Sequence, residues 1–202
     1  MIVDAAAVQL EPALAAARAG TLSGDLALQV REAAETHGVW LLLAHEAIGQ
    51  GGREGSRGAV LWRALQEGAV RDTLQQTESR RVIRAMASAR IDALILKGAH
   101  LSTALYQPSH LRPHVDLDLL VPPAVQSRAR EALTALGYQP AVVVQREAVL
   151  AQLAFERVEG GVRRVVDLHW RALNPHPFRD LLPFEEVWRR REAVPALGQA
   201  AW

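Results

Sequence analysis

The stretch Ile95–Val121, ILKGAHLSTALYQPSHLRPHVDLDLLV, decides the fold that we expect for the chain. It begins with an apolar run, turns at Lys97-Gly98, and continues with the spacing of a short helix. A loop with prolines then leads to a second apolar run, Asp116–Val121. This order predicts a buried strand, a tight turn, a short helix and a second strand.

Two carboxylates lie close together on the second of these strands. Side chains alternate between the faces of a strand, so Asp116 and Asp118 point the same way. Like charges repel unless a positive charge lies between them, and we therefore expect Asp116→Asn or Asp118→Asn to leave stability equal or higher. A magnesium ion binds carboxylate and phosphate oxygens together. The pair predicts a metal-dependent site that handles phosphate.

The turn before this strand is a candidate phosphate site. Ile91–Leu96 is apolar at nearly every position after Asp92, as in a strand that is covered on both faces. Gly98 allows a ligand to approach the backbone closely. The free N–H groups that open the next helix, together with its dipole, suit a phosphate, and Lys97 adds a charge. The alternative is a helix start that needs only a tight turn.

A third carboxylate lies on the second strand of a predicted hairpin. Gly-Gly separates Ala154–Glu159 from the alternating run Val162–Trp170, in which Asp167 and His169 share one face. An unpaired carboxylate among valines and leucines is costly to bury. Either a metal ion or a salt bridge to the neighbouring Arg163 or Arg164 would remove that cost.

Four sequence blocks carry a resemblance to a known family. LKGAHLSTALY, LRPHVDLDLLV, LGY and VDLHW, in this order, resemble the bacterial uncharacterised nucleotidyltransferase family, within the superfamily that includes DNA polymerase beta. The resemblance covers about Ala93 to Trp170 well and the helical N-terminal part loosely. It implies an α/β (α+β) fold, with a mixed sheet of the polymerase beta-like type, flanking helices and a helical N-terminal region.

The resemblance also implies an activity and a set of site residues. The activity is magnesium-dependent transfer of a nucleoside monophosphate from an NTP, expected to be ATP, to a hydroxyl of an acceptor that is a protein, a small molecule or RNA. Two Mg²⁺ ions are expected, and Mn²⁺ is a possible substitute. The implied catalytic and metal-binding residues are Asp116, Asp118 and Asp167. The implied nucleotide-binding residues are Lys97, Gly98, Ala99, Arg112 and His169.

The roles of the Gly98-Ala99 turn and of Arg112 stay open. Two functions other than nucleotidyl transfer also stay open, namely binding of a partner protein and metal-dependent hydrolysis. Gly98-Ala99 replaces the superfamily's usual Gly-Ser, which removes a hydroxyl that would bind phosphate, and Arg112 can pair with the aspartates instead of a phosphate. An antitoxin-like or inactive protein of this fold would act by binding a partner protein. A metal-dependent hydrolase would use His110, His114 and Asp116, but the proline between the histidines disfavours a ligand-bearing helix.

Composition and helical spacing predict the class of protein, its location in the cell and its division into regions. The chain has 202 residues, 22% of them charged, and a net charge of +1, which is ordinary for a soluble protein and gives no strong nucleic-acid signal. The absence of cysteine excludes disulfides and thiolate metal sites. No apolar run approaches the ~20 residues of a membrane span, and no signal peptide is visible, so we expect a cytoplasmic protein. Residues 1–90 are expected to form the helical region and residues 91–202 the catalytic domain.

Overall fold

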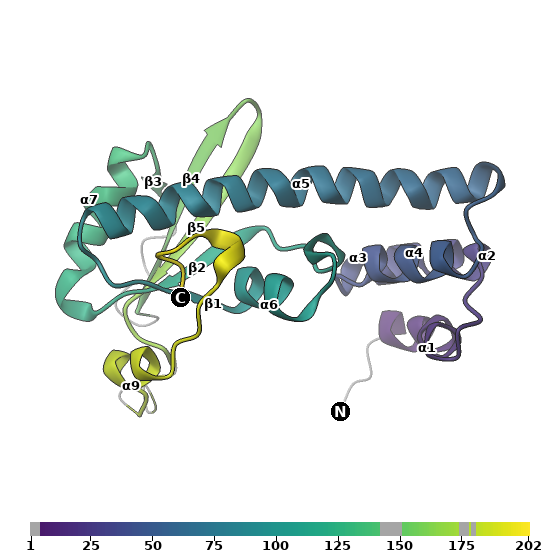
Figure 1. The fold of residues 1–202 in the computed structure, drawn as a ribbon, viewed down its shortest axis with the longest axis horizontal. Helices are drawn as coiled ribbons and strands as arrows, with labels where there is room; N and C mark the ends of the chain where they lie inside the picture. The colour runs from purple at the N-terminus through teal and green to yellow at the C-terminus, as the bar shows by residue number, and fades with distance from the viewer. Residues whose placement is uncertain (1–4, 142–150, 174–177, 179–180) are drawn as a thin grey trace. The chain divides into compact units, whose positions relative to one another are not determined.

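The structure, a computed structural model, describes residues 5–141, 151–173, 178 and 181–202 (Figure 1). The chain forms two compact units. One consists of Met1–Thr73 with Leu105–Pro113, and the other of Leu74–Ala104 with His114–Trp202. The predicted division of the chain near residue 90 stays a prediction.

The first unit is helical, as the sequence predicts. Its helices are α1 (Ala5–Arg18), α2 (Gly24–Gln29), α3 (Arg31–Thr36), α4 (Trp40–Gly49) and the first half of α5 (Gly55–Ser88). The Ser23 side chain caps α2 by accepting a hydrogen bond from the Leu26 N–H at 3.2 Å. Among the described residues, no helix combines the length and the apolar character that a membrane span requires.

The second unit contains a five-stranded mixed sheet, which confirms the predicted mixed sheet. Its strands are β1 (Leu94–Leu96), β2 (Asp116–Leu120), β3 (Gln139–Pro140), β4 (Gln152–Glu159) and β5 (Val162–His169). They lie in the order β1-β2-β5-β4-β3, and only β2 and β5 run parallel. The Gly-Gly turn joins β4 to β5 as a hairpin, as predicted.

Helices α6 (Lys97–Leu105), α7 (Gln126–Ala135) and α9 (Phe184–Arg189) are the α-helices among the described residues of this unit, together with the second half of α5. Gly137 follows α7 with a φ of +86°, and its N–H binds the Thr134 carbonyl, as a glycine after a helix commonly does. A short helix expected near Glu147–Gln152 falls mostly outside the described residues, and Gln152 begins β4.

Alternation along the central strands gives the sheet one wholly apolar face and one on which the aspartates lie beside a smaller apolar cluster with Leu94 and Leu120. The apolar face packs against α5 and α7, and its core residues include Leu117, Leu119, Val166 and Leu168 from the sheet with Val82, Met86, Ala129 and Leu133 from the helices. Burial of each large side chain contributes ~1.5–3 kcal/mol. The same alternation leaves the aspartates on the opposite face, so packing of the core fixes which way the polar side chains point.

A buried ionic network joins α5 to the sheet. The Glu78 carboxylate accepts hydrogen bonds from the Tyr138 hydroxyl and from Arg157 Nη2, both at 2.8 Å. Burial raises the pKa of Tyr138, and the neighbouring Glu78 raises it further. The Glu78 and Arg157 side chains are only 13% and 11% exposed, so the pair lies largely outside water.

Candidate metal centre

The parallel pairing of β2 with β5 brings the polar residues of both strands together. In this register Asp118 pairs with Asp167, and Leu120 pairs with His169. Neighbouring strands are ~4.8 Å apart, so the two aspartates lie side by side on one face. His169 follows two residues after Asp167 and therefore shares that face.

Asp118, Asp167 and His169 form a group that can hold a metal ion. Their ligand atoms all lie within 4.8 Å of one another. Asp118 and His169 are buried, and Asp167 is half-buried. Asp116 is half-buried on the same strand and belongs to the sequence-predicted ligands, but it is not part of this group. The structure thus brings together two of the three predicted carboxylates and adds a histidine.

Asp118 is held by two nitrogen atoms. Lys97 Nζ lies 2.8 Å from Asp118 Oδ1, and His169 Nε2 lies 3.0 Å from the same oxygen. Burial alone would raise the pKa of Asp118, but the hydrogen bonds from His169 and Lys97 outweigh it and lower this pKa below its usual value. Asp118 is therefore a carboxylate, not a carboxylic acid, at neutral pH.

Asp167 is in the opposite electrostatic situation. Burial raises its pKa above the usual value, and the charges of Asp116 and Asp118 raise it further. In the described part of the chain, neither neighbouring arginine forms an ion pair with it. Arg163 makes two 2.7 Å hydrogen bonds to Glu156, and Arg164 binds the Gln75 side chain at 3.2 Å. The salt-bridge alternative is therefore wrong.

The donor set fits a divalent cation. A cation between Asp118 and Asp167 would neutralise the repulsion that raises the pKa of Asp167. Carboxylate oxygens suit magnesium and manganese, whereas an imidazole suits zinc, iron, copper or nickel better than magnesium. The carboxylates thus agree with the predicted magnesium, while His169 widens the range of metals that this group can bind.

The predicted phosphate turn lies directly beside this group. Helix α6 begins at Lys97, immediately after β1, and Lys97 adopts a left-handed φ of +49°. The first backbone N–H groups of α6 have no partner inside the helix, as phosphate binding requires. Gly98 also has a packing role, because a Cβ there would lie 3.0 Å from His114 Cβ. Ala99 is buried in the core of the unit. The roles of Lys97, Gly98 and Ala99 toward a nucleotide stay predictions.

Arg112 belongs to the other compact unit. Its guanidinium lies 5.8 Å from the centre of the Tyr106 ring. Its roles toward the phosphate or the aspartates stay predictions. The residues of the hydrolase alternative, His110, His114 and Asp116, are not in the metal-capable group.

Sequence reasoning missed the contacts that Asp118 makes. The nucleotide-binding roles that the sequence predicts for Lys97 and His169 stay predictions, and the structure adds that both side chains contact the Asp118 carboxylate. The signal for His169 was present, because an Asp-x-His pattern on a strand puts the imidazole on the face of the aspartate. The Lys97 contact depends on the pairing of Leu96 with Asp118, which no local pattern reveals.

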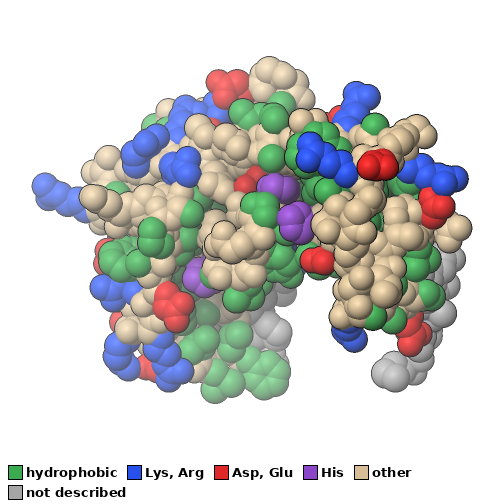
Figure 2. All heavy atoms as spheres, turned by 45° about the vertical axis from the view of Figure 1, so that its right-hand side comes forward, with side chains coloured by type: hydrophobic (Ala, Val, Ile, Leu, Met, Phe, Trp, Pro, Cys, Tyr) green, Lys and Arg blue, Asp and Glu red, His purple; other side chains and the backbone are tan. Residues whose placement is uncertain are grey.

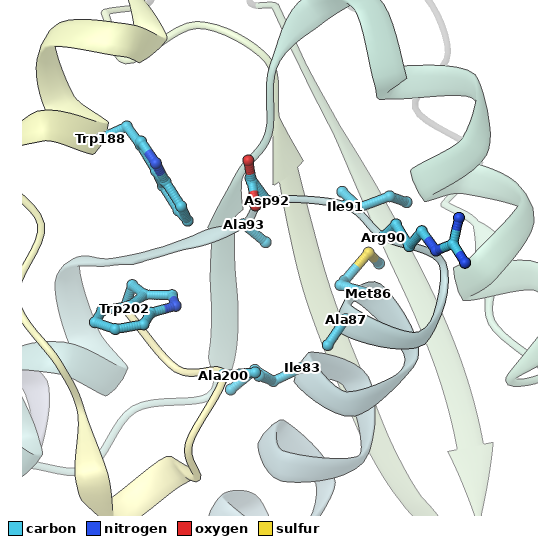
Figure 3. Close-up of a pocket in the computed structure, with 10 residues that line it drawn as sticks. All are labelled: Ile83, Met86, Ala87, Arg90, Ile91, Asp92, Ala93, Trp188, Ala200 and Trp202. Atoms are coloured by element: carbon cyan, nitrogen blue, oxygen red, sulfur yellow. The ribbon is translucent and has the colours of Figure 1, made fainter.

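Basic and acidic side chains are interspersed on the face seen in Figure 2, in keeping with the net charge of +1. Figure 3 shows a pocket of about 210 Å³ that Trp188 and Trp202 line together with residues of α5 and of the segment before β1. The metal-capable residues do not line it.

Comparison with known proteins gives one match. Residues 28–202 match the family described as "Uncharacterised nucleotidyltransferase". No curated protein and no solved structure matches the chain. The match confirms the family resemblance, and it includes most of the N-terminal helices that the resemblance covers loosely.

Proposed function

This chain belongs to the uncharacterised nucleotidyltransferase family, and from that premise we propose that it transfers a nucleoside monophosphate from an NTP to an acceptor hydroxyl. ATP is the first NTP to test. The observation that carries the proposal is the pairing of Asp118 with Asp167 across two parallel strands, with His169 beside them. We further propose that the sheet is of the polymerase beta-like type, as the family implies.

In this reaction the acceptor oxygen forms a bond to the α-phosphorus, and the bond from that phosphorus to the bridging oxygen of the β-phosphate breaks. Pyrophosphate leaves with that oxygen, and the hydroxyl proton must be removed. Asp116, Asp118 and Asp167 would hold the divalent ions. A bound ion neutralises phosphate charge and lowers the pKa of the attacking hydroxyl.

The protein's own groups supply position and charge. Asp118 stays ionised because Lys97 and His169 donate to it. The first N–H groups of α6 point to where the phosphates of the NTP would bind.

A transfer experiment tests the proposal. The full chain is incubated with Mn²⁺ or Mg²⁺, a cell lysate, and ATP labelled on either the α- or the γ-phosphate. We expect label on an acceptor from α-labelled ATP only, and none with Asp118→Asn. Label from γ-labelled ATP would indicate a kinase. The absence of transfer with all four labelled NTPs would contradict the proposal.

One observation favours a second function. Lys97 Nζ already provides a positive charge at Asp118, as an internal substitute for a metal ion would. A protein in which this contact is permanent would bind nucleotide or a partner protein without catalysis, in line with the antitoxin-like alternative. Metal binding by the purified chain distinguishes the two functions.

A further inference from the structure

Two tryptophans and an arginine form a stacked group in the C-terminal segment. The Arg191 guanidinium lies 4.3 Å from the Trp188 ring centre and 4.8 Å from the Trp202 ring centre. The two indoles meet edge to face, with 6.4 Å between their centres, and Figure 3 shows both beside one pocket. The Trp202 carbonyl accepts a 2.6 Å hydrogen bond from the Ile95 N–H, which fixes the stacked group at β1.

A second pocket of about 350 Å³ lies on another side of the same stacked group. Its volume falls within the usual range for small-molecule sites, ~300–1,000 Å³. Leu94, Leu96 and Val187 give it apolar walls, and Trp202 and Arg191 add an aromatic and a cationic surface. His100 and Glu192 supply polar groups that can donate and accept hydrogen bonds.

Leu96 links this pocket to the candidate metal centre, although Asp118, Asp167 and His169 do not line the pocket. Leu96 pairs directly with Asp118 across β1 and β2, so both side chains are on the same face of the sheet. The next residue, Lys97, binds the Asp118 carboxylate, and His100 follows in the first turn of α6. Leu96 and His100, which both line the pocket, thus lie on either side of the start of α6 in the chain.

We propose that the pocket bordered by Leu96, Val187, Arg191 and Trp202 takes the base of the nucleotide. This inference rests on the proposed function. A nucleobase is planar, has apolar faces and carries donors and acceptors on its edge, which matches apolar and aromatic walls with a polar rim. An indole such as that of Trp202, which lines the pocket, can stack on any base. The triphosphate belongs instead to the metal centre and the N–H groups of α6.

Val187→Trp, which fills the pocket with a larger side chain, tests the inference. Its binding of ATP is compared with its binding of a ligand that has the phosphates but no base. With Mn²⁺ present, the full chain is titrated by calorimetry with ATP and with inorganic tripolyphosphate, which has the phosphates but no base. For the wild type we expect ATP to bind at least tenfold more tightly than tripolyphosphate. Val187→Trp should weaken ATP binding at least tenfold and leave tripolyphosphate binding unchanged.

The control is Glu185→Trp, which places the same bulky side chain on the same helix but in a neighbouring pocket. We expect it to bind ATP as the wild type does. Equal weakening by both tryptophan variants, or unchanged ATP affinity in Val187→Trp, would overturn the inference. If Val187→Trp does not fold, the comparison of the two ligands on the wild type decides.

The outcomes separate this inference from the function that it builds on. Wild-type protein that binds tripolyphosphate and ATP equally well overturns the base pocket and leaves nucleotidyl transfer standing. Wild-type protein that binds neither ligand in the presence of metal overturns both. If Val187→Trp weakens the binding of ATP and of tripolyphosphate by the same factor, the pocket takes the phosphates and not the base. That result also overturns the inference.

Discussion

Lys97 and Asp118 form an ion pair, with 2.8 Å between Nζ and Oδ1, at the point where β1 turns into α6. The Asp118 side chain is only 6% exposed, whereas that of Lys97 is 63% exposed. The lysine can therefore leave the carboxylate without an element of the fold having to move. In the absence of metal, Lys97 supplies the positive charge that a metal ion would bring to Asp118.

The first prediction concerns competition between this lysine and a metal. Lys97→Met should bind Mn²⁺ several-fold more tightly than the wild type, because no internal cation then competes for Asp118. Its affinity for tripolyphosphate should fall, because a charge beside α6 is lost. Calorimetric titrations measure both affinities, with Lys97→Arg as the control that keeps the charge. Equal Mn²⁺ affinity in Lys97→Met and wild type would show that the pair does not compete with the metal.

The second prediction is that replacing Asp118 and replacing Asp167 have opposite effects on the free energy of unfolding. Asp118→Asn leaves a lysine and a buried histidine with a weaker acceptor, and the cost should be about 1–3 kcal/mol of unfolding free energy. This revises the expectation from sequence that replacing Asp118 would leave stability equal or higher. Asp167→Asn should leave stability equal or raise it, because it removes repulsion. Urea unfolding with a chelator present measures both, and the opposite order of stabilities would refute this account.

The third prediction is that the difference in unfolding free energy between Asp167→Asn and the wild type depends on pH. The folded-state pKa of Asp167 is raised, so its ionised form destabilises the fold above that pKa. As pH falls through this pKa toward the usual value of ~3.9, the carboxyl takes up its proton and the penalty disappears. The advantage of Asp167→Asn should therefore be largest near neutral pH and vanish at about pH 4. A difference that stays constant from pH 7 to pH 4 would exclude the repulsion.

The fourth prediction concerns the Glu78 network. Glu78→Ala should cost about 3–5 kcal/mol of unfolding free energy, since it leaves the mostly buried Arg157 without its partner there. The control is Glu159→Ala, because Glu159 also pairs with Arg157, at 2.9 Å, but is 71% exposed. It should cost under ~1 kcal/mol. If both variants lowered the unfolding free energy by similar amounts, burial of the Glu78–Arg157 pair would not be what makes it important for stability.

Local patterns were sufficient to predict much of the fold. The apolar run before Lys97, the alternation after Val162 and the Gly-Gly turn each predicted a strand or turn that the structure contains. These signals are readable because period-2 alternation and turn chemistry act over a few residues. Strand order is different. The parallel pairing of β2 with β5 joins residues about fifty positions apart, and no local preference encodes it.

For the candidate site as well, local patterns predicted some residues but not the contacts between them. Asp118 was predicted because it shares one face of a strand with Asp116, and Asp167 because a carboxylate in an apolar strand is costly without a partner. The partners themselves were not predicted, because the contacts of Lys97 and His169 with Asp118 depend on the register of three strands. Glu78 was missed for a related reason, since a charged residue in a long helix usually faces solvent.

We propose above all that Asp118 and Asp167 hold a divalent cation between them, and the melting temperature tests this proposal most directly. A metal that binds only the native state at 100 times its Kd stabilises it by about 2.7 kcal/mol. We predict that Mn²⁺ and Mg²⁺ raise the melting temperature of the chelator-treated wild type, and that Asp167→Ala abolishes most of this rise while melting like the wild type without metal. No rise in the wild type, or an equal rise in Asp167→Ala, would contradict the account.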